Sequence, residues 1–432
     1  MKNPALEFTH SLRYDDIPEN VRDWALLCIL DLVGIGIGGA LMKSSQIATR
    51  HAQTMFGGTV PIPFAGGTAS PVGAALATGV TIDALDGHDG FNPAKGHAGA
   101  GTFASTVAFM QNLGITDGQE FITCMVIGYE LACRTAMAQH ATCPDYHTSG
   151  AWVAVAAAAI GARLMTLDND QTRHAMGIAE YHGPRSQMMR CIDHPTMVKD
   201  GTGWGAMAGT SAAYMARDGF TGAPALTVEK APEFWQDLGT RWLTLEQYFK
   251  PYPVCRWAQA PVEAVLDLRR THGLTPSDVD SITIESFHEA VRLATNTPQS
   301  TDEAQYSTSY PCAVAMARGT VGPADIADEA LNDPEIMRLS QSLSLIEHDH
   351  ANTHFPETRY ARATITTKDG HSHTSPWHTP RWDWETPPTQ EEFHSKFRNI
   401  AHPLKGTETS EAIEEAIKNL PKASATDLFN LL

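Results

Sequence analysis

Positive charge is scarce in this sequence. Its 31 lysines and arginines are outnumbered by 49 aspartates and glutamates, which gives a formal net charge of -18 at pH 7. Nucleic acids and anionic membranes both attract basic surfaces, so neither is expected as a partner. A small anionic molecule is still compatible with this charge, because binding one requires only a local group of cations.

Paired cysteines and a signal segment are also absent. The 7 cysteines form no C-x-x-C pair, and residues 1–16 contain no apolar segment of the kind found in secretory signals. These absences predict a cytoplasmic protein with free thiols. The most apolar runs, 26–41 and 152–165, are interrupted by Asp31 and Arg163 and are rich in glycine and alanine. We therefore predict buried helices there and no membrane span.

Several common catalytic and cofactor motifs are missing. There is no G-x-S-x-G elbow and no P-loop, and the G-x-G-x-x-G at 34–39 follows a predicted helix, whereas a dinucleotide site needs a strand before it. Histidines and acids gather at 88–97 and at 348–354, and the second group is interpreted as solvated loop residues. Neither a metal nor an organic cofactor is expected.

The stretch 83–103, DALDGHDGFNPAKGHAGAGTF, concentrates ionisable groups in a glycine-rich backbone. Glycine is retained where the backbone bends sharply or approaches another group closely, and polar loops between apolar helices often carry function. The same composition is compatible with a solvated connection that is merely rich in turn residues. The stretch is therefore a candidate site whose assignment depends on the rest of the chain.

The apolar spacing predicts a mainly α protein with a smaller α+β module. The first half follows helical spacing almost throughout, and alternation typical of strands appears only at 281–287 and in a hairpin at 361–375 with an Asp-Gly turn. Helices are expected over 102–113, 116–129, 151–165, 171–179, 204–217, 260–271, 311–318, 334–345 and 411–420. We predict a large all-helical domain formed by residues 1–254 and 385–432, and a central α+β domain formed by residues 255–384.

Polar residues gather at the ends of the predicted helices in four clusters. These are Asp86, His88, Asp89 and His97; Tyr146 and His147; Arg185, Arg190 and Lys199; and Lys250 and Arg256. Basic side chains that converge in an acidic protein are suited to a substrate with two or three carboxylates. Removing a proton from the carbon beside a carboxylate needs a positioned base and nearby cations, which these residue types supply.

These clusters carry a family resemblance. The chain resembles the MmgE/PrpD family, whose acidic pattern L-D-x-D-D is followed by H-P/A-G/S, then by a His, a Lys, F-K-x-[YF]-P and a Tyr that opens a helix. The corresponding positions are Leu85 to Gly90, His97 to Gly99, His147, Lys199, Phe249 to Pro253, and Tyr310. The chain departs from the pattern at His88, where the second acid of the pair is expected, and at Cys255.

The resemblance implies an all-helical larger domain, an α+β lid, a homodimer, an active site between the domains and no cofactor. It also implies an acid/base enzyme acting beside a carboxylate of a small di- or tricarboxylate. Epimerisation of the iminodisuccinate-epimerase type is favoured narrowly. The alternatives are a hydro-lyase of the 2-methylcitrate dehydratase type, then a decarboxylase of the cis-aconitate type, and outside catalysis a carboxylate-binding dimer.

The expected roles follow from the same resemblance together with the predicted convergence of basic groups. Lys199 with His147 or Tyr146 forms the acid/base pair, and Asp86 and His97 tune it. The residues expected to bind substrate are Asp89, Arg185, Arg190, Lys250 and Tyr310.

Overall fold

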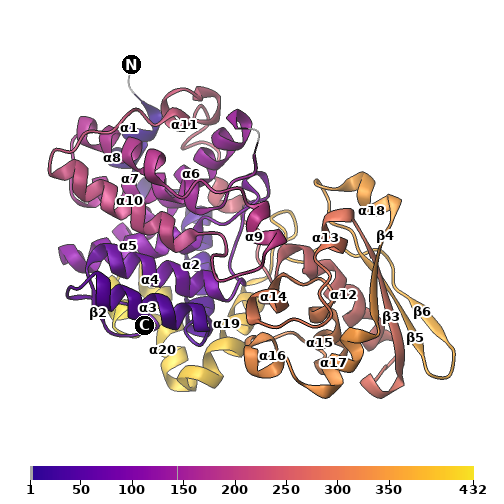
Figure 1. Ribbon diagram of the computed structural model, residues 1–432. Coiled ribbons are helices and arrows are strands. Elements are labelled where there is room, and N and C mark those ends of the chain that lie inside the picture. Colours follow the sequence, from indigo (N-terminus) through magenta and orange to yellow (C-terminus); the bar gives the residue numbers. More distant parts are fainter. Residues whose placement is uncertain (1–2, 144) are drawn as a thin grey trace. The chain divides into compact units, whose positions relative to one another are not determined.

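The computed structural model describes residues 3–143 and 145–432, and the chain forms two compact units. Unit 1 comprises Met1–Cys191, Val198–Tyr248 and Pro388–Leu432, and unit 2 comprises Ile192–Met197 and Phe249–Pro387. Helices dominate the described chain, and the strands are few and short, which confirms the expected mainly α fold with a smaller α+β part (Figure 1).

Unit 1 is built almost entirely from helices. Its helices before residue 248 are α1 Pro4–Ser11, α2 Glu19–Gly39, α3 Lys43–Met55, α4 Pro71–Ala84, α5 Gly99–Leu113, α6 Gly118–Thr142, α7 Gly150–Leu164, α8 Asn169–His182, α10 Thr202–Arg217 and α11 Leu226–Glu229. The strands β1 (Val60–Pro61) and β2 (Thr68–Ala69) pair antiparallel beside them, and α9 (Met189–Asp193) contains the position where the chain passes to unit 2. Short 3₁₀ turns lie at η1 Tyr14–Asp16, η2 Asn92–Ala94, η3 Pro232–Phe234 and η4 Leu243–Glu246.

Small residues let the central helices of unit 1 approach closely, as the alanine-rich sequence predicted. In Figure 1, α7 and α10 run side by side, and they form the largest helix–helix contact. A Cβ atom at Gly209 of α10 would lie 2.2 Å from the carbonyl oxygen of Ala154 on α7. No real side-chain carbon tolerates that distance, so the glycine is required by backbone-to-backbone packing.

The glycine run at 34–39 forms the last turns of a helix, as the buried helix predicted over 26–41 implies. Helix α2 continues through it to Gly39. A Cβ at Gly39 would lie 1.9 Å from the Thr81 carbonyl oxygen on α4, and one at Gly36 would lie 2.5 Å from the Phe64 ring. These glycines are explained by close packing, and their helical conformation is maintained by the surrounding core.

Helix α6 differs from its prediction at both ends. It begins after Asp117, whose side chain accepts the Gln119 N–H at 2.8 Å, and it runs to Thr142, well beyond the expected end. By length and composition α6 could cross a membrane, as could the bent pair α2 and α3 taken together. Within α6, however, 94% of the apolar window is buried inside the protein, as in the core helix of a globular protein.

Unit 2 contains a four-stranded sheet with helices. The helices are α12 Arg256–Thr271, α13 His288–Arg292, α14 Thr301–Tyr306, α15 Tyr310–Arg318, α16 Pro323–Ile326, α17 Pro334–Gln341 and α18 Asp349–His354, with 3₁₀ turns η5 Pro276–Asp278 and η6 Asp328–Ala330. The strands are β3 Val279–Ser286, β4 Leu343–Glu347, β5 Arg362–Thr367 and β6 Ser372–Thr374, in the order β4-β3-β5-β6. β4 is parallel to β3, with Ile282 opposite Leu343, and the other pairs are antiparallel.

The predicted helix 334–345 is wrong at its end. Helix α17 stops at Gln341, and Leu343 already belongs to β4. The apolar residues near the end of 334–345 fit both the helical period and the strand period over so short a run. The pairing of β4 with β3 decides in favour of the strand. The hairpin of β5 and β6 forms as predicted, with Gly370 at φ 89° in the Asp-Gly turn.

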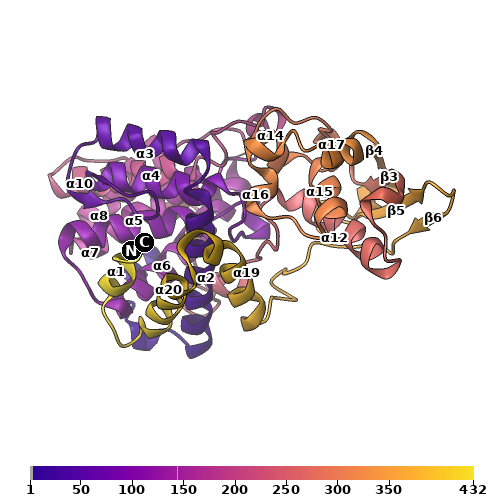
Figure 2. The same ribbon diagram turned by 90° about the horizontal axis from the view of Figure 1, so that it is seen from below.

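The last helices belong to unit 1. They are α19 Gln390–Lys405, α20 Thr407–Asn419 and α21 Ala425–Phe429. Figure 2 shows α19 and α20 alongside α2, with which both make contact. Lys396 of α19 donates to Asp31 of α2 at 2.5 Å and to the carbonyl oxygen of Gly87 at 2.8 Å. The C-terminal segment thereby holds the backbone next to His88.

Candidate active site

The candidate site in unit 1 comprises the stretch 83–103 and the residues around Lys199. Its backbone adopts unusual conformations. Among residues 3–143 and 145–432, six non-glycine residues have positive φ, and three of them lie here: Asp86 (51°), Lys95 (53°) and Lys199 (46°). A left-handed conformation costs a non-glycine residue about 1 kcal/mol, so it persists where the surroundings enforce it. Such strain is concentrated at functional sites, which supports this assignment.

Asp89 is held in a buried pocket of donors. It is fully buried, and its carboxylate accepts hydrogen bonds from the Tyr129 hydroxyl of α6 and from the Gly99 N–H at 3.3 Å. Burial raises the pKa of Asp89 to about 7, against the lowering effect of the Tyr129 hydrogen bond. A side chain at position 99 would collide with it, since a Cβ there would lie 2.2 Å from the Asp89 carboxylate.

His97 connects the loop to two other segments. Its backbone N–H donates to Ser149 Oγ at 2.9 Å, its Nδ1 contacts the Asp89 carbonyl oxygen, and its Nε2 lies 3.5 Å from Asp200 Oδ2. The Ser149 hydroxyl donates to the same Asp200 oxygen at 2.8 Å. Ser149 is the N-cap residue of α7, but its side chain makes no cap bond and donates to Asp200 instead. His97 is thus oriented from three sides.

Asp83 joins this group from the end of α4. Its carboxylate accepts the Thr202 N–H at 3.4 Å, at the first residue of α10. Burial and the nearby Asp200 raise the pKa of Asp83 to about 7, and Lys199 acts in the opposite direction. Lys199 itself is 4% exposed. The structure thus brings Lys199 and the predicted Asp86 into the electrostatic neighbourhood of one buried carboxyl group.

His88 lies within the same cluster and is completely buried. Its Nε2 lies 3.9 Å from Asp83 Oδ1, and its ring centroid lies 4.4 Å from that of His97. The residue that departs from the family pattern is therefore in contact with both a candidate site histidine and a carboxyl group of raised pKa.

Tyr146 and His147 form a second group that touches the same loop. The Tyr146 hydroxyl donates to the Lys95 carbonyl oxygen, and the His147 N–H donates to His140 Nε2 at 3.3 Å. Burial and the positive charge of Arg185 lower the pKa of His147, so its imidazole is neutral near pH 7. A bond of 3.0 Å from the Gly150 N–H to the Asp200 carbonyl oxygen links this segment to the one that carries Lys199.

The remaining predicted residues are not brought into this cluster. Arg185 is exposed and donates to Cys143 Sγ at 3.0 Å, and its charge acts on His147. Arg190 is exposed and donates to Ser186 Oγ at 3.4 Å. Substrate binding by these two arginines stays a prediction.

Lys250 and Tyr310 belong to unit 2. Lys250 is buried. The Tyr310 hydroxyl donates to the backbone oxygens of Asp325 at 3.4 Å and Ala330 at 3.3 Å, and burial raises its pKa to about 12. Its hydroxyl is therefore already engaged within its own unit, and substrate binding by these two residues stays a prediction.

Sequence reasoning missed the partners Asp83, Asp200, Ser149 and Tyr129. Asp83 and Asp200 lie close in sequence to the predicted site residues Asp86 and Lys199, and this closeness was the signal that could have identified them. Tyr129 lies in the middle of a helix, where nothing in the sequence marks it. In the part of the chain that the structure describes, no group of three or more His, Cys, Asp or Glu side chains is arranged to hold a metal ion.

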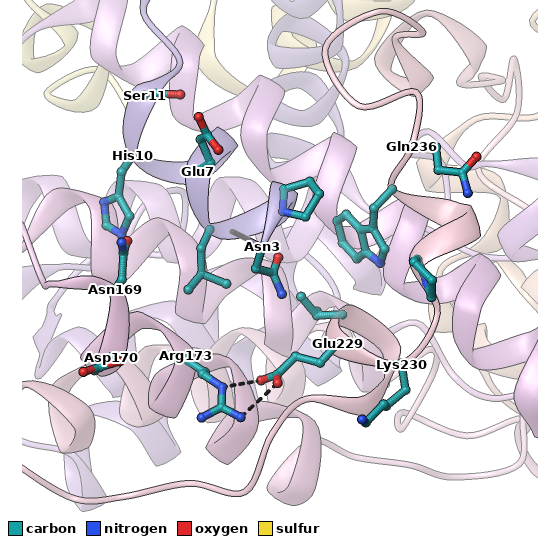
Figure 3. Close-up of a pocket in the computed structure, with 15 residues that line it drawn as sticks. Asn3, Glu7, His10, Ser11, Asn169, Asp170, Arg173, Glu229, Lys230 and Gln236 are labelled. Atoms are coloured by element: carbon teal, nitrogen blue, oxygen red, sulfur yellow. Dashed lines mark hydrogen bonds and ion pairs between the residues drawn. The ribbon is translucent and has the colours of Figure 1, made fainter. Parts of the chain in front are cut away.

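A separate groove lies on another part of unit 1. It has a volume of about 1140 Å³ and is lined by residues of α1, α8 and the α11–η3 region (Figure 3). Its arginine, Arg173, is held in bidentate fashion by Glu229 at 2.7 and 2.9 Å. This guanidinium is already neutralised, and none of the predicted site residues lines the groove.

Comparison with known proteins covers nearly the whole chain. Residues 6–239 match the MmgE/PrpD N-terminal domain, and residues 252–422 match the MmgE/PrpD C-terminal domain. The cis-aconitate decarboxylase of Homo sapiens is 22% identical, with 95% of this chain and 90% of that protein aligned. The cis-aconitate decarboxylase of Aspergillus terreus is 23% identical, with 98% and 93% aligned.

A second kind of enzyme is also among the relatives. The mitochondrial 2-methylcitrate dehydratase of Yarrowia lipolytica is 23% identical, with 84% of this chain and 76% of that protein aligned. Both family domains and enzymes of two activities are therefore matched over most of the sequence, and the chain belongs to the MmgE/PrpD family.

Proposed function

We propose that the protein is an acid/base lyase that removes water from a small hydroxylated di- or tricarboxylate. The observation that carries the proposal is the meeting of a buried lysine, a neutral histidine and carboxyl groups of pKa near 7 on segments tied to one loop. A hydro-lyase needs a base for the proton beside a carboxylate and an acid for the departing hydroxyl. Both kinds of group are present.

His147 is suited to be the base. Its lowered pKa keeps it neutral near pH 7, and its Nδ1 lies 2.8 Å from the Asp145 carbonyl oxygen. A carbonyl only accepts, so a neutral ring carries its proton on Nδ1 and leaves Nε2 free to take another. Tyr146, whose hydroxyl is bonded to Lys95, is less suited.

Lys199 is suited to be the acid and the cation that binds a substrate carboxylate. Its amine is a hydrogen-bond donor, and it is buried close to Asp83, whose pKa its charge lowers. The reaction balances without an oxidant: the base takes the proton, a carbon–carbon double bond forms, and the hydroxide leaves with the proton of the acid as water. His97 and Asp86 act in this scheme by holding and tuning the loop.

Decarboxylation is the second candidate, and the names of the human and Aspergillus terreus relatives favour it. There the carbon–carboxylate bond breaks, CO₂ leaves, and an acid such as Lys199 protonates the carbanion. Epimerisation, the narrow preference from sequence, has no named relative among these matches and yields to the lyase alternative. Homodimer formation and a cytoplasmic location stay predictions.

The test is a panel of tricarboxylates and hydroxydicarboxylates incubated with the protein in deuterated water. Formation of an unsaturated acid with no CO₂ supports the hydro-lyase. Release of CO₂ overturns it in favour of the decarboxylase, and deuterium exchange without loss of water or CO₂ would favour the epimerase. Absence of all three with every acid would leave the carboxylate-binding dimer as the better interpretation.

A further inference from the structure

Two buried imidazoles lie between two carboxyl groups in unit 1. The order in space is Asp83, His88, His97, Asp200, with separations of 3.9 Å from Asp83 to His88 Nε2, 4.4 Å between the ring centroids, and 3.5 Å from His97 Nε2 to Asp200. We call these four residues the Asp-His-His-Asp quartet. Each of the four is less than a tenth exposed.

The hydrogen-bond partners of His97 restrict where its protons lie. Its Nδ1 faces the Asp89 carbonyl oxygen, which only accepts, so Nδ1 carries a hydrogen. Its Nε2 faces a carboxylate oxygen of Asp200. In a neutral ring that contact sets a lone pair against an anion, so the arrangement is favourable only when Nε2 or the carboxyl group is protonated.

The distance between the rings disfavours a second positive charge once one imidazole is protonated. Two cations at this separation in a buried setting repel each other far more than they would in water. Two carboxylates without any proton nearby would repel each other in the same way. One proton located among the four groups relieves both conflicts.

We infer that His88 and His97 share one proton in the sense that only one of the two rings is cationic at a time, and that His88 is a positioning residue which sets the charge state of His97. The raised pKa of Asp83, which burial and Asp200 cause, agrees with a proton retained in the quartet near pH 7. The positioning role of His88 in turnover rests on the proposed acid/base reaction. The sharing of the proton by His88 and His97 does not.

The charged and titratable groups around the quartet come from every element packed against it. They are Asp31 of α2, Asp86 after α4, Asp89, Tyr129 of α6, Lys199, Tyr248 and Lys396 of α19. Lys396 is engaged by Asp31, and Asp89 is hydrogen-bonded by Tyr129. Lys199 and Asp86 act directly on Asp83, where the first lowers and the second raises the pKa of the carboxyl group.

The sequence adds a reason for a histidine at position 88. The family pattern has an aspartate there, which would give this cluster a further carboxyl group beside Asp83, Asp86 and Asp89. A histidine instead supplies a neutral or cationic ring in the same place.

The test uses the full-length protein labelled with ¹⁵N-histidine and no substrate. We expect the His88 and His97 ring resonances to titrate together in the wild type. In His88→Phe, which keeps a ring beside His97, the proton passes to His97 alone and its titration moves up by about one pH unit, the size of a strongly coupled pair. An unchanged His97 titration would overturn the sharing. If His88→Phe does not fold, His88→Gln makes the same test.

Turnover supplies the second readout. Because His97 tunes the loop tied to the acid/base pair in the proposed scheme, we expect the acid limb of the pH profile of kcat/KM to shift in both variants. A uniform loss of rate at every pH, with the limb unmoved, would show a merely structural role and overturn the positioning assignment.

His373→Gln is the matched control, because His373 stacks on His272 at 4.0 Å in unit 2 and should leave the profile unchanged. If the wild type turns over none of the acids, the proposed function fails, while the NMR titration still decides the sharing.

Discussion

Histidines gather in two regions of this protein, and only one region has the surroundings of a catalytic centre. In unit 1, His88 and His97 are buried, flanked by Asp83 and Asp200, and next to strained backbone. In unit 2, His350 lies 4.6 Å from His354, 4.7 Å from Tyr360 and 4.8 Å from Trp377, and the side chains are at least partly exposed. Density of histidine in the sequence is similar in both.

The difference lies in what each ring faces. Carboxyl groups and a buried lysine make protonation in unit 1 sensitive to its neighbours, and such perturbed groups are concentrated at functional sites. In unit 2 the rings of His350 and His354 pack on aromatic side chains, and His348 lies 3.8 Å from Glu285 at a partly exposed position. The group expected to be solvated loop is instead the helix α18 with His348 at its N-cap. Burial and charged partners, more than composition, separate the two regions.

The largest expected effect comes from Lys199→Ala. Removing the proposed acid should lower turnover by about 10²- to 10⁴-fold. It should also let Asp83 hold its proton to higher pH, because Lys199 lowers that pKa. Steady-state rates on the best acid of the panel measure the first effect.

Lys43→Ala is the control for that variant. Lys43 is exposed at the start of α3 and should retain full turnover. If Lys199→Ala also retained it, the unit 1 cluster would lose its main distinction from the histidines of unit 2.

A second variant, Gly99→Ala, tests how tightly the unit 1 cluster is packed. The new Cβ would lie 2.2 Å from the Asp89 carboxylate and 2.5 Å from the Tyr129 hydroxyl. Overpacking of this kind costs about 1–3 kcal/mol, measured as the free energy of unfolding in urea. Gly57→Ala is matched to it, since nothing lies within 4 Å of that Cβ, and it should change stability by about 0.5 kcal/mol or less. Equal losses in the two variants would contradict a tight pocket.

These contrasts show which parts of the site could be read from the sequence. The loop 83–103 was identifiable because glycines and ionisable residues coincide between apolar helices. Its pairings were not, because Asp83, Ser149 and Asp200 meet only when α4, α7 and α10 pack together. Ser149 shows the limit well: its position before a helix predicts a cap, and tertiary packing gives its hydroxyl to Asp200 instead.

The fold was predictable to a similar degree and for the same reason. Helix existence followed from apolar spacing, whereas ends depended on contacts far along the chain. The glycines of α2 are helical because Thr81 and Phe64 pack against them, and Leu343 is in a strand because Ile282 pairs with it. Neither partner is visible in the local sequence.

The pH dependence of stability offers a finer test through Asp89→Asn. Folded Asp89 keeps its proton to a pKa of about 7, whereas an unfolded aspartate ionises near pH 4. Between these values the folded state binds more protons, so this group makes the protein less stable as pH rises, by at most about 1.4 kcal/mol per pH unit. Asparagine cannot ionise, so the variant should lose less stability than the wild type between about pH 5 and 7 in urea titrations. Asp15→Asn is the control, because the Asp15 side chain is 94% exposed, and its stability should change with pH as in the wild type. If the free energy of unfolding of Asp89→Asn changed with pH as steeply as in the wild type and in Asp15→Asn, the raised pKa of Asp89 would be contradicted.

The smallest effect is expected in unit 2, from His350→Gln. His350 contacts Trp377 and Tyr360, and its pKa is lowered by burial and by the neighbouring His354, so it is already neutral near pH 7. Glutamine is neutral as well, and loss of a partly exposed ring should change the free energy of unfolding by about 0.5 kcal/mol. Turnover and its pH profile should not move, because no carboxyl group of raised pKa depends on this ring. A shifted pH profile of turnover in this variant, at unchanged stability, would mean that the histidines of unit 2 take part in the chemistry. Burial among carboxyl groups would then not be what distinguishes the two regions.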